Sequence, residues 1–273
     1  MERVKILSFV ALTQYVMRYA VMMPLTQSAG VEMQISELTF AALVASSMCI
    51  AASICRQNTK TIHLIICATG LLTGGGIIWM IGVSSMITVY IMVALMVTFY
   101  FSFYRHQFLV GNIYVAIFSA MIPLPILLEI PLIYRIYGQN PALVSNLNFA
   151  IYIVIFLAVF IFLTALLCEF LRDTEDFEND NISDDCQSFP FVMGSPFVKQ
   201  TIICINAALI IMICCLYFLL LRDITGWFSF LYLLFLIVIP ILLVSWKVHF
   251  AETGDHYRRA CNLMKMTLIA GVA

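Results

Sequence analysis

Long apolar runs dominate this sequence and limit what it can fold into. Each run lasts about 20 residues, enough for a helix to cross the hydrocarbon core, whereas a membrane barrel strand needs about 10 residues of alternating polarity. We expect an all-α, polytopic membrane helical bundle with about nine transmembrane segments and a single domain, 1–273. The runs are 5–24, 38–55, 62–82, 85–104, 108–128, 146–168, 200–221, 226–246 and 258–273, of which the last is short for a span.

Composition and the placement of basic residues support a cell-membrane location. Hydrophobic residues make up 63% of the chain, charged residues 11%, and the mean hydropathy is +1.03. With the amino terminus in the cytoplasm, the positive-inside rule is obeyed, because most basic residues between segments fall on the cytoplasmic side. These are Arg3, Lys5, Arg56, Lys60, Arg105, Arg172, Lys199, Lys247, Arg258 and Arg259, against Arg135 and Arg222 outside.

Other features exclude some classes of function. The nine cysteines show no spacing typical of metal ligands. Their positions in apolar runs predict that they are small buried hydrophobic residues. A net charge of −1 gives no reason to expect a nucleic-acid partner.

The acids gather in one cytoplasmic stretch, LRDTEDFENDN at 171–181. Asp173, Asp176 and Asp180 are spaced i, i+3, i+7, so on a continuous helix they share one face. Carboxylates so placed repel one another unless a cation lies among them, and Mg²⁺ binds through one or two carboxylates plus substrate phosphates. Arg172 adjoins this face and suits phosphate oxygens. The alternative interpretation is a hydrated loop made acidic for solubility.

The residues around this stretch resemble the second aspartate-rich motif of the UbiA superfamily of intramembrane prenyltransferases. That motif reads R-E-x-x-K-D-x-x-D-x-x-G-D, and Glu169, Asp173, Asp176 and Asp180 match it. Upstream, YRHQFLVGN (104–112) is similar to the opening of the family's fifth helix, with Tyr104 and Asn112 as expected cavity residues. LTQYVMRY (12–19) resembles the first helix of bacterial geranylgeranylglycerol-phosphate and quinone prenyltransferases.

The resemblance implies a helical bundle around a cavity open to lipid. In that family Mg²⁺ holds an isoprenyl diphosphate, and a lipid or aromatic acceptor attacks the prenyl group. The family's first aspartate-rich motif is missing, because no Asp or Glu occurs between Glu37 and Glu129. Arg56 and Lys60 lie where it should be, either as diphosphate contacts in place of a metal or as ordinary cytoplasmic anchors.

Two polar residues at membrane depth, Gln14 and Arg18, are one turn apart in the first segment. Such residues usually face a cavity or a partner. They either line the substrate cavity or make an interhelical contact, for example to Glu129 or Asn112. Glu129 falls near the outer interface, so we expect its side chain to be hydrated.

Three functions stay open. The first is a UbiA-like prenyltransferase, impaired by the lost motif. The second is a non-catalytic descendant that binds isoprenoid or lipid. The third is a transporter, which only the number of segments suggests.

Overall fold

In the computed structural model, every regular element among the described residues is helical. The structure describes residues 2–54, 60–100, 109–179 and 189–272. Within these ranges it leaves out the side chains of 2–5, 54, 60–64, 84–86, 89 and 223–225. The all-α prediction is confirmed for this part of the chain. The described residues form two compact units, 1–99 with 120–158, and 100–119 with 159–273.

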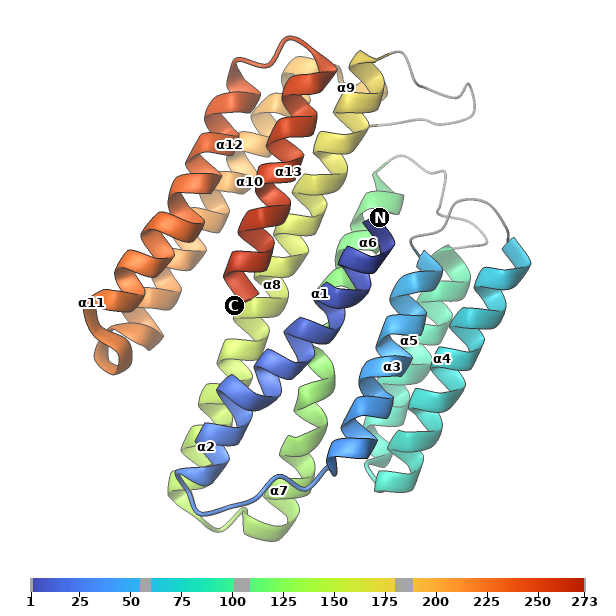
Figure 1. Cartoon of the computed structure of the whole chain (residues 1–273), viewed down its shortest axis with the longest axis vertical. Coiled ribbons are helices and arrows are strands. Elements are labelled where there is room, and N and C mark those ends of the chain that lie inside the picture. Colours follow the sequence, from blue (N-terminus) through green and yellow to red (C-terminus); the bar gives the residue numbers. More distant parts are fainter. Residues whose placement is uncertain (1, 55–59, 101–108, 180–188, 273) are drawn as a thin grey trace. The chain divides into compact units, whose positions relative to one another are not determined.

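The first unit begins with one continuous helix made of α1 (Glu2–Val16), the π-helical η1 (Met17–Met22) and α2 (Met23–Gln27). After an irregular segment follow α3 (Glu37–Ile54), α4 (Lys60–Ile81) and α5 (Ser84–Phe99). Figure 1 shows these last three side by side in blue and cyan. The unit also contains the 3-10 helix η3 (Leu124–Leu128), α7 (Glu129–Tyr137) and the start of α8 (Pro141–Glu178).

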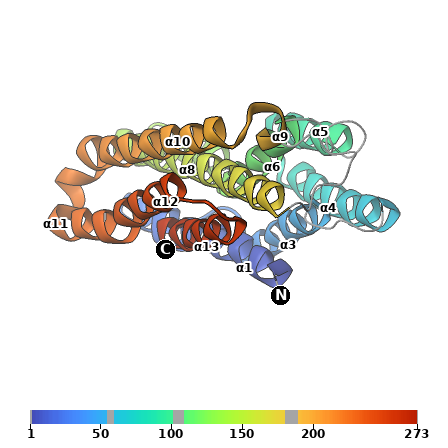
Figure 2. The ribbon, with the colours of Figure 1, turned by 90° about the horizontal axis from the view of Figure 1, so that it is seen from above.

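The second unit holds most of α6 (Val110–Ala120), the remainder of α8 and the carboxyl-terminal helices. These are α9 (Phe189–Met193), α10 (Ser195–Leu216), η4 (Tyr217–Leu221), α11 (Arg222–Leu233), η5 (Leu234–Val238), α12 (Ile239–His249) and α13 (Gly254–Val272). In this unit α12 packs between α10 and α13 (Figure 2).

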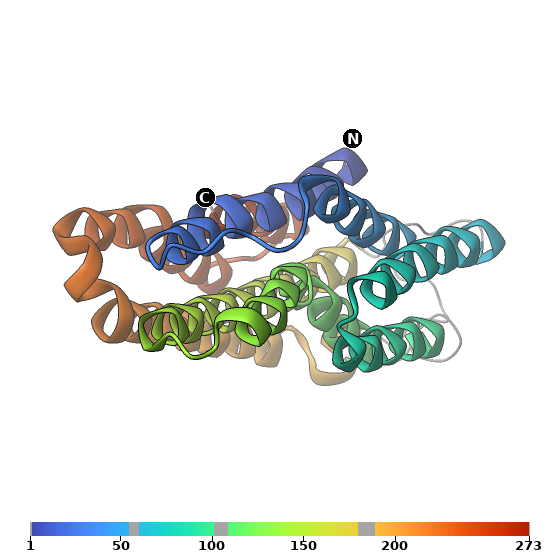
Figure 3. The same cartoon turned by 90° about the horizontal axis from the view of Figure 1, so that it is seen from below.

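The chain reverses direction inside α11, at Gly226. Its φ of 64° and ψ of −156° interrupt the helix. The residues before Gly226 and those from Trp227 onwards therefore form two separate helical segments. The orange segment in Figure 3 shows this reversal. A glycine fits here because L-residues with a side chain are strained in this conformation.

Each predicted apolar run coincides with a helix or a bent helix pair, but not every helix is long enough to span. Four described helices have the length and composition to cross a membrane: Ile6–Gln27, Pro141–Glu178, Ser195–Leu221 and Gly226–His249. Val110–Ala120 and Leu124–Tyr137, bent by 49°, make a fifth if they count as one span. The described helices are thus long and apolar enough for four or five spans, while a count of nine spans remains a prediction.

Candidate functional site

The acidic stretch continues α8 beyond its apolar run. α8 has 38 residues, which corresponds to about 57 Å at 1.5 Å per residue. The hydrocarbon core needs only about 20 residues. The apolar run ends at Cys168, and the turns from Glu169 to Glu178 are not needed to cross that core.

Asn112 of α6 holds one of the predicted metal ligands. Its Nδ2 donates a hydrogen bond of 2.6 Å to Oδ2 of Asp173 on α8. Burial raises the pKa of Asp173 to about 6, and the Asn112 amide opposes that rise because it favours the ionised carboxylate. The structure thus brings together two predicted site residues, 61 positions apart in the sequence.

α13 packs along a different side of the same helix. The Cys261 thiol donates to the carbonyl oxygen of Cys168 at 3.8 Å, and Arg258 Nε lies 3.9 Å from Glu175 Oε1. At the end of α8, Gly254 lies against the Asn179 side chain, where a β-carbon would collide with it. These contacts fix the start of α13 beside the acidic turns.

Between the α6 contact and the α13 contacts lies a further side of α8. By helical geometry it carries Glu169, Arg172 and Asp176, at spacings of three and four residues. Arg172 and Asp176 are exposed, whereas Glu169 is half-buried and accepts a hydrogen bond of 3.1 Å from Arg172 Nη1. We call Glu169, Arg172, Asp173 and Asp176 the acidic face of α8.

Towards the amino end of α8 the same side is apolar. Ala165 and Phe162 precede Glu169 by four and seven residues and are partly exposed. Leu167 and Cys168, on the other sides, are buried, and so is Leu166, which precedes Glu169 by three residues and Asp173 by seven and lies beside this stripe. A polar head group on the acidic face would therefore have an apolar stripe beside it on the same helix.

The acidic face does not form a complete metal cage. Among the described residues, no three His, Cys, Asp or Glu side chains are arranged to hold a metal ion. Asp173 and Asp176 fit the way in which Mg²⁺ binds together with a diphosphate, since one or two carboxylates then suffice. They do not fit a tight site for Mg²⁺ alone.

Several predicted site residues cannot be placed on this face. Asp180, Arg56 and Tyr104 lie outside the described residues, and Lys60 begins α4 with its side chain outside them. Arg258 was not predicted as a site residue, because its sequence position suggested only a cytoplasmic anchor. The contact between Glu175 and Arg258 spans 83 residues, and nothing in the local pattern indicates it.

Gln14 and Arg18 belong to the first unit and make interhelical contacts there. Gln14 Nε2 donates to the carbonyl oxygen of Ile122 at 2.9 Å. Arg18, 2% exposed, lies 3.4 Å from Glu129 Oε1 and donates to the Ile35 carbonyl oxygen at 2.6 Å. Its guanidinium also stacks over the Phe40 ring at 4.4 Å.

The expectation that Glu129 is hydrated is wrong. Its side chain is fully buried, and its carboxylate accepts hydrogen bonds from the backbone N–H groups of Gln34 and Ile35. The cause is the segment between α2 and α3, whose N–H groups cover the start of α7. In the folded protein, these N–H donors and Arg18 replace the water that would otherwise solvate the Glu129 carboxylate.

Comparison with protein families, curated proteins and solved structures found no match to this chain.

Proposed function

We propose that this chain is a membrane protein that binds an isoprenyl diphosphate on the acidic face of α8, together with Mg²⁺, and transfers the prenyl group slowly to a lipid or aromatic acceptor. The proposal rests on the motif resemblance and on the geometry of α8.

One observation carries the proposal: the acidic face and the apolar stripe are continuous on one side of α8. Asp173 and Asp176 are suited to a Mg²⁺-bound diphosphate, while Ala165 and Phe162 offer an apolar surface to a hydrocarbon chain. An isoprenyl diphosphate has the same division between a charged head and an apolar tail.

Basic residues flank the proposed diphosphate position. Arg172 lies on the acidic face, and α13 brings Arg258 within 3.9 Å of Glu175, one residue before Asp176. Guanidinium groups bind phosphate oxygens with paired hydrogen bonds.

Binding without turnover is the second candidate. It is favoured because the described residues contain no three-ligand metal group and the sequence lacks the first motif. Loss of one metal's charge stabilisation amounts to several kcal/mol, so a rate about a thousandfold lower is expected.

The test uses the purified full chain in detergent with a radiolabelled isoprenyl diphosphate. We expect Mg²⁺-dependent binding that falls at least about tenfold in Asp173→Asn/Asp176→Asn, since two charge-assisted contacts are lost. Asp255→Asn, an exposed acid at the start of α13, is the matched control and should bind normally. Equal binding by the folded double variant would identify the face as hydrated surface only.

Transfer is measured in the same preparation with lipid and quinone-precursor acceptors. Labelled product that requires Mg²⁺ supports the enzyme, and binding without product supports the second candidate.

A further inference from the structure

Two cysteines of the second unit meet at the contact between α8 and α13. The Cys261 thiol donates to the carbonyl oxygen of Cys168 at 3.8 Å, and the two thiols are hydrogen-bonded to each other. Both are free thiols, and the Cys168 and Cys261 side chains are 7% and 4% exposed. A disulfide needs two cysteines whose side chains are directed at each other, and these two meet that condition although they are 93 residues apart in the sequence.

Contacts on both sides of the two thiols fix their position. Gly271, near the carboxyl end of α13, lies against the Phe160 ring of α8, where a β-carbon would collide with it. Near the other end of α13, Arg258 Nε lies 3.9 Å from Glu175 Oε1. Because the lower residue number in α8 is paired with the higher one in α13, the two helices run antiparallel (Figure 1). The thiols lie between these two contacts and therefore stay neighbours in a packed interface.

The surroundings of Cys261 favour its thiolate, which is the form that attacks an oxidant. The hydrogen bond from the Cys168 thiol lowers the pKa of Cys261, and the positive charges of Lys265 and Arg172 act in the same direction. Burial and the negative charge of Glu169 oppose this decrease. α13 is not among the candidate spans, and the apolar run of α8 ends at Cys168, so the two sulfur atoms are at the polar end of that run.

Burial selects a small oxidant. At 7% and 4% exposure, the two cysteines exclude a bulky disulfide such as oxidised glutathione, whereas hydrogen peroxide is little larger than a water molecule. The predicted cytoplasmic position suits a transient bond, because cytosolic disulfides are usually catalytic or redox-sensing. We propose that Cys168 and Cys261 form a reversible oxidation site, at which hydrogen peroxide converts the two thiols into a disulfide between α8 and α13.

The reaction has two steps. The Cys261 thiolate attacks one oxygen of hydrogen peroxide, so that an S–O bond forms, the O–O bond breaks and the departing hydroxide takes up a proton to become water. The Cys168 sulfur then attacks the resulting sulfenic acid at sulfur. The S–S bond forms, the S–O bond breaks, and the second water leaves with the Cys168 proton. Two thiols are thereby oxidised and one peroxide is reduced, and neither thiol belongs to the acidic face.

The test uses the reduced full chain, purified in detergent and exposed to hydrogen peroxide at neutral pH. Remaining thiols are alkylated, and disulfide-linked peptides are mapped by mass spectrometry. We expect the Cys168–Cys261 peptide pair to be at least about tenfold more abundant than any other pair among the nine cysteines, because oxidation is selective for a paired, activated thiol. Dithiothreitol should remove it. The same chain unfolded in SDS before oxidation should lose this selectivity.

Variants identify the attacking sulfur. In Cys168→Ser, peroxide should leave a sulfenic acid on Cys261, which dimedone traps. In Cys261→Ser, Cys168 should stay unlabelled. Cys204→Ser is the matched control and should keep the disulfide, because Cys204 is an exposed thiol on the separate candidate span Ser195–Leu221.

Four results would count against the proposal. Absence of the Cys168–Cys261 peptide pair from the folded wild-type chain would overturn it, even if a serine variant failed to fold. Equal yields from the folded and the SDS-unfolded chain would also overturn it, since the contact would then play no part. Dimedone labelling of Cys168 in Cys261→Ser would refute Cys261 as the attacking thiol. Faster oxidation by oxidised glutathione would refute peroxide as the oxidant. None of these results depends on diphosphate binding.

Discussion

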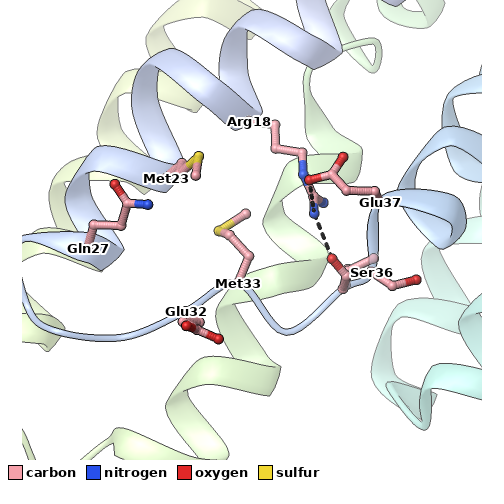
Figure 4. Close-up of a pocket in the computed structure, with 8 residues that line it drawn as sticks. Arg18, Met23, Gln27, Glu32, Met33, Ser36 and Glu37 are labelled. Atoms are coloured by element: carbon pink, nitrogen blue, oxygen red, sulfur yellow. Dashed lines mark hydrogen bonds and ion pairs between the residues drawn. The ribbon is translucent and has the colours of Figure 1, made fainter.

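Arg18 and Glu129 are a buried ion pair in which each charge depends on the other. Their side chains are 2% and 0% exposed. Removing one partner of such a pair costs up to about 3–5 kcal/mol, and Glu129→Gln leaves Arg18 beside the 66% exposed Glu37, whose Oε1 lies 3.4 Å from Arg18 Nη2 (Figure 4). We therefore expect Glu129→Gln, which keeps an acceptor for the Ile35 N–H, to lower the midpoint of thermal unfolding by several degrees, as scanning fluorimetry in detergent would show.

The matched control for Glu129→Gln is Glu32→Gln. Glu32 is exposed, so the same change should shift the free energy of unfolding by less than about 0.5 kcal/mol. Similar losses in both variants would mean that Glu129 contributes no more than a surface carboxylate.

Asp173 offers a second prediction for a single residue. Its carboxyl group should titrate near pH 6 in the ligand-free protein, because burial disfavours the charged form. In Asn112→Leu the amide that favours ionisation is lost, so the pKa should rise further. Selective ¹³C labelling of aspartate and NMR titration measure both values, with Asp173→Asn identifying the signal. An unchanged or lower pKa in Asn112→Leu would contradict the contact between the two side chains.

The residue scale is also where sequence reasoning failed most clearly. Asp173 and Asn112 were both chosen as site residues, but their contact depends on how α6 meets α8, which neither local pattern encodes. The sequence predicts Glu129 in water because it falls just after the apolar run 108–128, near the outer interface. Its burial depends on a segment about 95 residues earlier, whose N–H groups cover it.

Among the elements, α11 contains a reversal that requires glycine. Gly226 adopts φ 64° and ψ −156°, a conformation that costs other residues about 1–3 kcal/mol. Gly226→Ala should therefore destabilise the second unit by that amount, measured by urea or thermal unfolding. Gly75, in α4 with nothing within 4 Å of an added β-carbon, is the control. There alanine should be neutral or stabilising by up to about 1 kcal/mol. Equal effects of the two substitutions would show that the conformation at Gly226 carries no strain.

The sequence predicts the positions of the long helices better than it predicts where these helices end. Apolar runs locate the long helices, because burial in lipid or protein needs the same side chains, whereas the short helices α7 and α9 lie outside every run. The run at 146–168 is part of a helix that extends to Glu178, because acidic residues that contact α6 and α13 continue it. Conversely, α13 carries Asp255, Arg258, Arg259 and Lys265, and it is not among the candidate spans.

For the whole molecule, α8 gives the most direct test of topology. It is a single helix of 38 residues, with a mean hydropathy of 3.0 in its most apolar window. Such a helix can cross the membrane once with both ends in water. Gln139, just before it, and Glu178, its last residue, are both exposed and should therefore be on opposite sides.

The positive-inside rule assigns the sides, with Glu178 in the cytoplasm. In a cysteine-free background, Gln139→Cys should react with an impermeant maleimide in intact cells, and Glu178→Cys only after permeabilisation. The reverse pattern would invert the topology but keep α8 as a span. Reaction of both variants in intact cells would show that α8 does not cross the membrane. The cytoplasmic position of the acidic face, which the positive-inside rule predicts, would then be wrong as well.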